Sequence, residues 1–158
     1  MKSLLVLNLV LLPAAASFAQ QAPLPSPTTA AAKLPIVLPP KKANTALIQR
    51  RDSGLVALTA LVQGLVNRGY AIKDVNREQL TVRTEPRAVS EVGGVVLEGA
   101  VRGRQFVLTG AFAPELTSHH STPIVYPGEG HSGRANAAWE ELVKTAGLLG
   151  PNVTYRAE

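Results

Sequence analysis

All three histidines of the chain lie in one stretch, residues 115–131, together with two glutamates. His119 and His120 are adjacent, and Glu129 and His131 follow later in the same stretch. Neutral imidazole and carboxylate groups are suitable zinc ligands. However, adjacent side chains of an extended segment point to opposite sides, and the spacing does not match a known zinc motif such as H-E-x-x-H. We therefore expect exposed loop histidines with no bound metal or cofactor, and a metal-dependent hydrolase that uses residues 115–131 is the alternative hypothesis.

Ser118 and Ser121 flank His119 and His120, which raises the question of nucleophilic catalysis. A serine–histidine pair also needs an orienting carboxylate, such as Glu115, and an oxyanion hole. Closeness in sequence does not supply that geometry, and serine is common in polar loops. The sequence therefore favours a protein without catalytic residues.

Two further patterns are better explained by structure than by chemistry. The glycine-rich run Gly128–Gly133 precedes a predicted helix, where backbone N–H groups can hold an anion. It lacks the lysine of a phosphate-binding loop and follows a long loop, so we expect a flexible lead-in to the helix. Glu140 and Glu141 are expected in the first turns of that helix, where carboxylates favour the positive end of the helix dipole. Adjacent helical residues point about 100° apart, so these two do not form an acid–base pair.

The first nineteen residues have the pattern of a cleavable export signal. Lys2 precedes an apolar run, Leu4–Leu12, and small residues at Ser17 and Ala19 place the cleavage before Gln20. The run is too short for a membrane anchor, because a bilayer span takes about 20 apolar residues. We therefore predict an exported protein, periplasmic or extracellular, that does not span a membrane.

Composition restricts the partners of the chain. It has no cysteine, so a hydrophobic core must stabilise it in place of disulfide bonds. The net charge of +5 favours anionic partners, but the arginines are scattered and aromatic residues make up only 4% of the chain. Because a nucleic-acid surface usually combines clustered basic residues with aromatic ones, we expect no nucleic-acid binding. An envelope protein or an anionic envelope component is the expected partner.

The predicted domain organisation is a signal, a linker and one domain. Six of the twelve prolines lie within residues 20–44, so this segment is predicted to be a disordered linker. Residues 45–158 are predicted to form a single domain. Apolar residues at three- and four-residue steps predict one helix over residues 45–68, ended by Gly69, and a second over residues 134–149.

Alternating polar and apolar residues predict two β-hairpins between these helices. Pro86 ends the first hairpin because it has no N–H to donate, and Arg102 and Gly103 form the turn of the second. A long loop follows, residues 113–133, and residues 152–155 are predicted to add a short edge strand after the second helix. The four main strands are predicted at residues 70–75, 80–85, 95–102 and 105–112.

The predicted fold is a two-layer α+β domain, in which two helices pack on one face of a four-stranded antiparallel sheet. Trp139 is expected at the centre of the interface between helices and sheet. The uncovered face is the main candidate for a binding site, because a mildly basic surface with small apolar residues between the charges can bind a peptide, a glycan or another copy of the chain. Self-association through this face or the sheet edges is a third hypothesis. The predicted binding residues are Lys73, Arg83, Arg102, Gln105 and Thr109.

Four segments, Arg68–Ile72, Leu80–Pro86, Val107–Phe112 and Ala138–Leu142, resemble a group of small exported bacterial domains of unknown function. Such domains are similar to the helix-grip modules of outer-membrane assembly lipoproteins, which act as binding or assembly accessories. The resemblance implies no catalytic residues, and this chain lacks the lipid-accepting cysteine that such proteins often have. The leading hypothesis is therefore a non-catalytic exported module that binds a protein or envelope component through its sheet face or its long loop.

Overall fold

The computed structural model describes residues 38–116, 118 and 120–158, and all of them belong to one compact unit. The predicted export signal and residues 20–37 of the predicted linker lie outside the described residues. The strands are β1 (Thr45–Gln49), β2 (Ile72–Asn76), β3 (Thr81–Thr84), β4 (Arg87–Val89), β5 (Gly93–Arg102), β6 (Gln105–Ala113), β7 (Thr122–Pro123) and β8 (Val153–Arg156), and the helices are α1 (Gly54–Asn67) and α2 (Arg134–Leu149).

The strands form one antiparallel sheet, to which the described residues contribute eight strands. Across the sheet the order is β2-β3-β5-β6-β1-β8, while β4 also pairs with β5 and β7 also pairs with β6. The predicted hairpins β2–β3 and β5–β6 are confirmed. The prediction of a four-stranded sheet is wrong in number, because β1, β4 and β7 were not predicted and β8 is a full member of the sheet.

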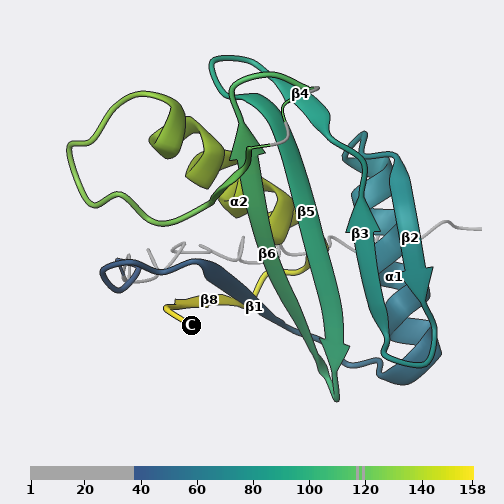
Figure 1. The fold of residues 1–158 in the computed structure, drawn as a ribbon. Coiled ribbons are helices and arrows are strands. Elements are labelled where there is room, and N and C mark those ends of the chain that lie inside the picture. Colours follow the sequence, from purple (N-terminus) through teal and green to yellow (C-terminus); the bar gives the residue numbers. More distant parts are fainter. Residues whose placement is uncertain (1–37, 117, 119) are drawn as a thin grey trace, which may run out of the picture. The chain divides into compact units, whose positions relative to one another are not determined.

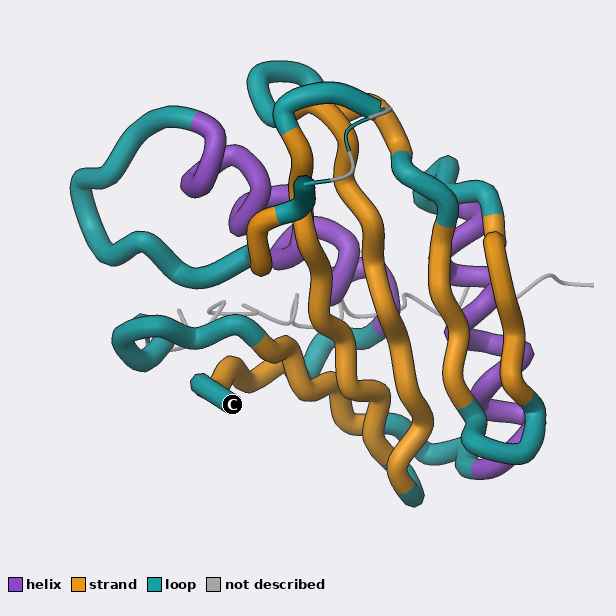
Figure 2. The backbone as a smooth tube through the Cα atoms, viewed as in Figure 1, coloured by secondary structure: helices purple, strands orange, loops and turns teal. Residues whose placement is uncertain are grey.

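Both helices lie behind the sheet in Figure 1, so that one face of the sheet is covered and the other is open. The backbone tube in Figure 2 shows the same arrangement, with the long β5–β6 hairpin in the middle. Alternate residues of this hairpin, such as Leu97 and Leu108, are fully buried and join Leu61 and Leu65 of α1 in the core. The mixed α+β fold with a large antiparallel sheet is thus confirmed.

The prediction of a helix that begins at Thr45 is wrong. Residues 45–49 form β1, which pairs with β6 on one side and with β8 on the other, and α1 begins only at Gly54. Leu47 and Ile48 fit either the apolar stripe of a helix or a buried strand, and periodicity alone does not separate the two. Pairing on both sides favours the extended form, since it satisfies the backbone groups of β1.

The end of α1 agrees with the prediction. Gly69 follows the helix with a φ of 91°, a left-handed conformation that glycine adopts without steric cost. Its N–H donates to the carbonyl of Val66 (2.8 Å), and the N–H of Tyr70 donates to the carbonyl of Leu65 (3.0 Å). These two bonds form a Schellman motif, which ends the helix and directs the chain into β2.

An irregularity in β2 changes which residues face outward. The pairing with β3 shifts register between Ile72 and Asp74. Strict alternation would place Asp74 on the same side as Ile72, whereas Asp74 lies on the open face and Val75 lies beside α1. The extra residue of a β-bulge explains this, because Lys73 and Asp74 then both face the open side.

α2 has the predicted bounds and carries Trp139 into the core. The indole ring packs against Tyr126 of the loop before α2 and against Tyr155 of β8, with ring centroids 5.4 and 5.2 Å away. Trp139 therefore fills the interface on the side of the sheet where β8 lies. None of the helices in the described part combines the length and the apolar character that a bilayer-spanning segment needs.

The beginning and the end of the described chain are joined to each other. The side-chain amide of Asn44 donates to the carbonyl of Glu158 (3.2 Å), and its oxygen accepts from the N–H of the same residue (3.0 Å). Ala43 is fully buried just before this pair. The antiparallel pairing of β1 with β8 places these two ends side by side.

Candidate binding face

The open face of the sheet is formed by the alternate residues of β3, β5 and β6 that point away from the helices. The antiparallel register sets Glu98 opposite Thr109, and Ala100 opposite Val107. On the other side of β5, Arg83 lies opposite Glu98. Charged, hydroxyl and small apolar side chains therefore alternate across the middle of the sheet.

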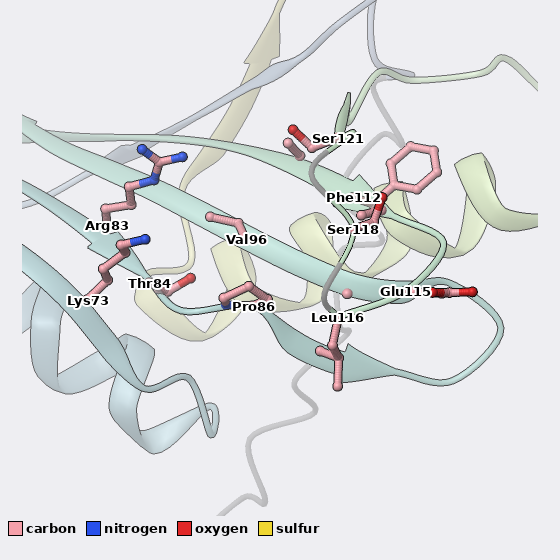
Figure 3. A pocket seen from close by; sticks show the side chains of 13 residues that line it. Lys73, Arg83, Thr84, Pro86, Val96, Phe112, Glu115, Leu116, Ser118 and Ser121 are labelled. Carbon is pink, nitrogen blue, oxygen red and sulfur yellow. The ribbon is translucent and has the colours of Figure 1, made fainter.

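A shallow hollow of about 300 Å³ lies on this face, between β3 and the loop that follows β6. Figure 3 shows Lys73 and Arg83 at one end of it and Glu115 and Leu116 at the other, with Val96 between them. One end of the hollow is thus basic, and the middle is apolar.

Two more hollows adjoin the first and share Arg83 with it. One, of about 380 Å³, extends along β5 to Arg102 and is also lined by Thr109. The other, of about 140 Å³, lies between them and includes Glu98 and Ser121. The three adjoining hollows share Arg83, and we call them together the sheet groove.

Arg83 remains available to a ligand in the sheet groove. Its guanidinium lies 3.2 Å from the Glu98 carboxylate, but both side chains are more than half exposed. Such exposed ion pairs contribute little, about 0–1 kcal/mol, so a bound anion can compete with Glu98. Lys73 has no carboxylate within 4 Å among the residues that the structure describes.

The structure brings together four of the five predicted binding residues. Lys73 and Arg83 line the first hollow, and Arg83, Arg102 and Thr109 line the second. Gln105 pairs in register with Arg102 on the open face but lies outside the three hollows.

The sequence did not indicate the residues that border the groove from outside the four predicted strands. Ser118 and Ser121 reach it from the loop after β6, and Glu158 reaches it from the end of the chain. No local pattern marks these residues, because tertiary packing alone brings the loop and the chain end to the sheet. Asp74 was missed for a different reason, namely the bulge in β2.

A second polar cluster lies inside the molecule and is centred on Glu141, which is only 5% exposed. Its two carboxylate oxygens accept from Arg68 (2.6 Å) and Arg87 (2.7 Å), which come from the end of α1 and from β4. The Oε1 atom also accepts from the Tyr70 hydroxyl (3.0 Å) and from Thr145 (3.4 Å). The cluster therefore joins α1, β4 and α2.

The expectation that Glu141 interacts with the start of α2 is wrong. It lies in the middle of the helix, and the first turn of α2 contains no acidic residue. The Arg87 guanidinium also stacks on the Tyr70 ring, 4.9 Å from its centroid. The pKa of the Tyr70 hydroxyl is raised above its ordinary value. Burial is the main cause, and the nearby Glu141 carboxylate is the second. Every oxygen of Glu141 has a partner, whereas the buried Nε–H of Arg68 has none among the described residues.

The histidine loop shows no metal-binding geometry where it is described. Among the residues that the structure covers, no group of three or more His, Cys, Asp or Glu is placed to hold a metal ion. His120 is exposed, and the Nδ1 atom of His131 lies 3.2 Å from the carbonyl oxygen of Glu129 in its own turn. His119 lies outside the described residues.

The chain matches no known protein family and no curated protein. The resemblance to exported helix-grip-like domains therefore stays a prediction, and the function has to be argued from the site.

Proposed function

We propose that this chain is an exported, non-catalytic module that binds an envelope component along the open face of its sheet. The observation that carries the proposal is the sheet groove, in which three adjoining hollows converge on Arg83. A groove that runs across several strands suits an elongated ligand better than a compact metabolite. Its basic end at Lys73 and Arg83 suits an acidic group on that ligand.

The polar groups of the groove support binding in place of catalysis. The hydroxyl of Ser118 exchanges hydrogen bonds with the backbone of His120, which makes it a loop-ordering group. Arg83, Glu98 and Thr109 lie on strands that are paired with their neighbours, where side chains can position a ligand without large rearrangement. The apolar residues between them add contact area.

A photo-crosslinking experiment tests the proposal in cells that export the chain. A photoreactive residue replaces Thr109 in the groove, and a matched probe replaces Lys144, which is exposed on α2 behind the sheet. We expect the probe at position 109 to give a discrete crosslinked band and the probe at position 144 to give none. Adding Lys73→Glu and Arg83→Glu should abolish the band, because carboxylates then replace both cations and repel an acidic ligand.

Equal crosslinking from both probes, or a band that survives the two charge reversals, would contradict the proposal. A band at twice the mass of the chain would assign the groove to a second copy of the protein. Mass spectrometry of the band distinguishes a protein from a glycan.

A further inference from the structure

One end of the sheet gathers basic residues from three separate segments. The β2–β3 turn lies beside the end of β5, because the N–H of Val101 donates to the carbonyl of Leu80 (2.9 Å). The β5–β6 turn lies beside the connection from β1 to α1, because the N–H of Arg50 donates to the carbonyl of Arg104 (2.8 Å). These segments meet at the lower end of the sheet in Figure 1.

Each of the three segments carries exposed arginine. Arg50, in the connection from β1 to α1, is not counted among these exposed arginines, because it is bound to Asp52, to the carbonyl of Leu149 and to the Phe106 ring. The remaining four arginines have no carboxylate within 4 Å in the described part of the chain. They are Arg51, Arg77, Arg102 and Arg104.

Large aliphatic side chains are exposed at the same end. Leu55 and Val56, in the first turn of α1, are 57% and 70% exposed. Leu55 and Arg77 line one hollow of about 610 Å³ between α1 and β2, so the aliphatic and basic side chains are neighbours. We call this region the basic tip, defined by the four arginines together with Leu55 and Val56.

The start of α1 adds to the positive potential of the basic tip. The first turn has no acidic residue, and Ser53 at the N-cap position makes no side-chain capping bond. The N–H groups of this turn and the positive end of the helix dipole therefore face outward. The carboxylates near this end are Asp52, which is paired with Arg50, Glu78 in the β2–β3 turn, and Asp74, which lines the hollow that reaches Arg102.

We propose that the basic tip docks on the surface of an anionic phospholipid bilayer. Arginines attract the charged headgroups, and protruding aliphatic side chains enter the boundary between headgroups and acyl chains. A soluble polyanion would use the charges but not Leu55 and Val56, which favours a membrane as the partner. The inference does not depend on the proposed function of the sheet groove. Arg102 belongs to both surfaces, but the other residues of the basic tip lie outside the three hollows of the groove.

A vesicle flotation experiment tests this with residues 38–158. This part contains the whole core described above, and it lacks the apolar run Leu4–Leu12, which would itself bind lipid. Vesicles of phosphatidylcholine are compared with vesicles that also contain phosphatidylglycerol, at low and at high salt. We expect binding only to the anionic vesicles and loss of binding at high salt, because salt screens exposed charges.

Variants separate the two contributions to binding. Arg51→Glu with Arg104→Glu should lower the partition coefficient at least about 25-fold, since each basic residue near an anionic surface contributes about fivefold. Leu55→Ser with Val56→Ser should lower it at least about tenfold, because less apolar area then enters the bilayer. The matched controls are Lys41→Glu with Lys42→Glu, before β1, and Val66→Ser, in the last turn of α1.

Circular dichroism confirms that each variant is folded before its binding is compared. Absence of binding to anionic vesicles, or equal binding to neutral ones, overturns the proposal. It is also overturned if the Lys41 and Lys42 controls lose as much binding as the arginine variants. Arg83→Glu should bind vesicles like the unchanged chain, so failure here and failure of the sheet-groove proposal are distinguishable.

Discussion

At the scale of single residues, the buried carboxylate of Glu141 is held by several partners at once. It is buried, it faces two arginines, and a tyrosine and a threonine complete its hydrogen bonds. Removing one member of such a buried ion cluster leaves an uncompensated charge, which costs more than the cluster itself contributes. Glu141 is therefore expected to matter for stability and not for ligand binding.

Glu141→Gln should lower the free energy of unfolding by about 3 kcal/mol or more, because Arg68 and Arg87 then face a neutral amide in a buried site. Urea unfolding followed by circular dichroism measures this change. The matched control is Glu140→Gln, an exposed neighbour that pairs with Lys144 and accepts a hydrogen bond from Asn136, each one turn away. A control as destabilised as Glu141→Gln would show that the buried cluster is not the cause.

The burial of Glu141 could have been predicted from helical spacing. Ala138, Leu142 and Thr145 lie three residues before, one after and four after it, and all three are buried on the same side of α2. A carboxylate within such a stripe must find cationic partners in the interior. Which arginines those are depends on tertiary packing, so Arg68 and Arg87 could not be predicted.

At the scale of elements, the predictions succeeded where a pattern was long or had clear ends. α2, the end of α1 and the β5–β6 hairpin follow directly from periodicity, glycine positions and turn residues. β4 and β7 are too short to show a period, and each depends on pairing with a longer strand. β1 was missed because five residues with two large aliphatics fit a helix and a strand equally well.

The assignment of residues 45–49 to a strand has a direct test. Proline in the first turn of a helix is tolerated, whereas proline within a paired strand removes a backbone donor. Since β1 is paired on both sides, Leu47→Pro should prevent folding or clearly lower the free energy of unfolding. Leu47→Ala, which removes the side chain but keeps the N–H, is the control and should unfold at clearly higher urea concentration.

In the candidate site too, residues placed by a local pattern could be predicted, and residues placed by tertiary packing could not. Alternation in β3, β5 and β6 predicted Arg83, Arg102 and Thr109 on one face, because side-chain period and strand pairing are local properties. The loop residues and Glu158 that border the sheet groove come from distant parts of the chain. The basic tip was missed because its arginines are scattered in sequence and meet only in the fold.

At the scale of the whole molecule, one core connects both helices to the sheet. Leu61 and Leu65 of α1, Leu142 and Ala146 of α2 and Leu97 of β5 belong to the same buried cluster. The two proposed binding surfaces thus rest on one folding unit. A variant of one surface that leaves the shared Arg102 unchanged should leave the other surface intact.

This shared core predicts cooperative unfolding of residues 38–158. The chain has one tryptophan, Trp139, which is buried between two tyrosines and reports on tertiary packing around α2. Its fluorescence and the far-ultraviolet circular dichroism should change at the same urea concentration, as in a two-state transition. Separate midpoints would mean that the α2 side and the rest of the sheet unfold independently.

The joined ends at Asn44 and Glu158 determine how the protein responds to mechanical load. Tension applied through these two points would pull β8 away from β1 starting at one end, so that their hydrogen-bonded residue pairs would separate one after another. Hydrogen-bonded pairs that are loaded one after another resist far less force than pairs that are loaded together. As a link between two anchored bodies, the domain would therefore lose the pairing of β8 with β1 at low force. This would expose the edge of β1 before the rest of the fold is strained.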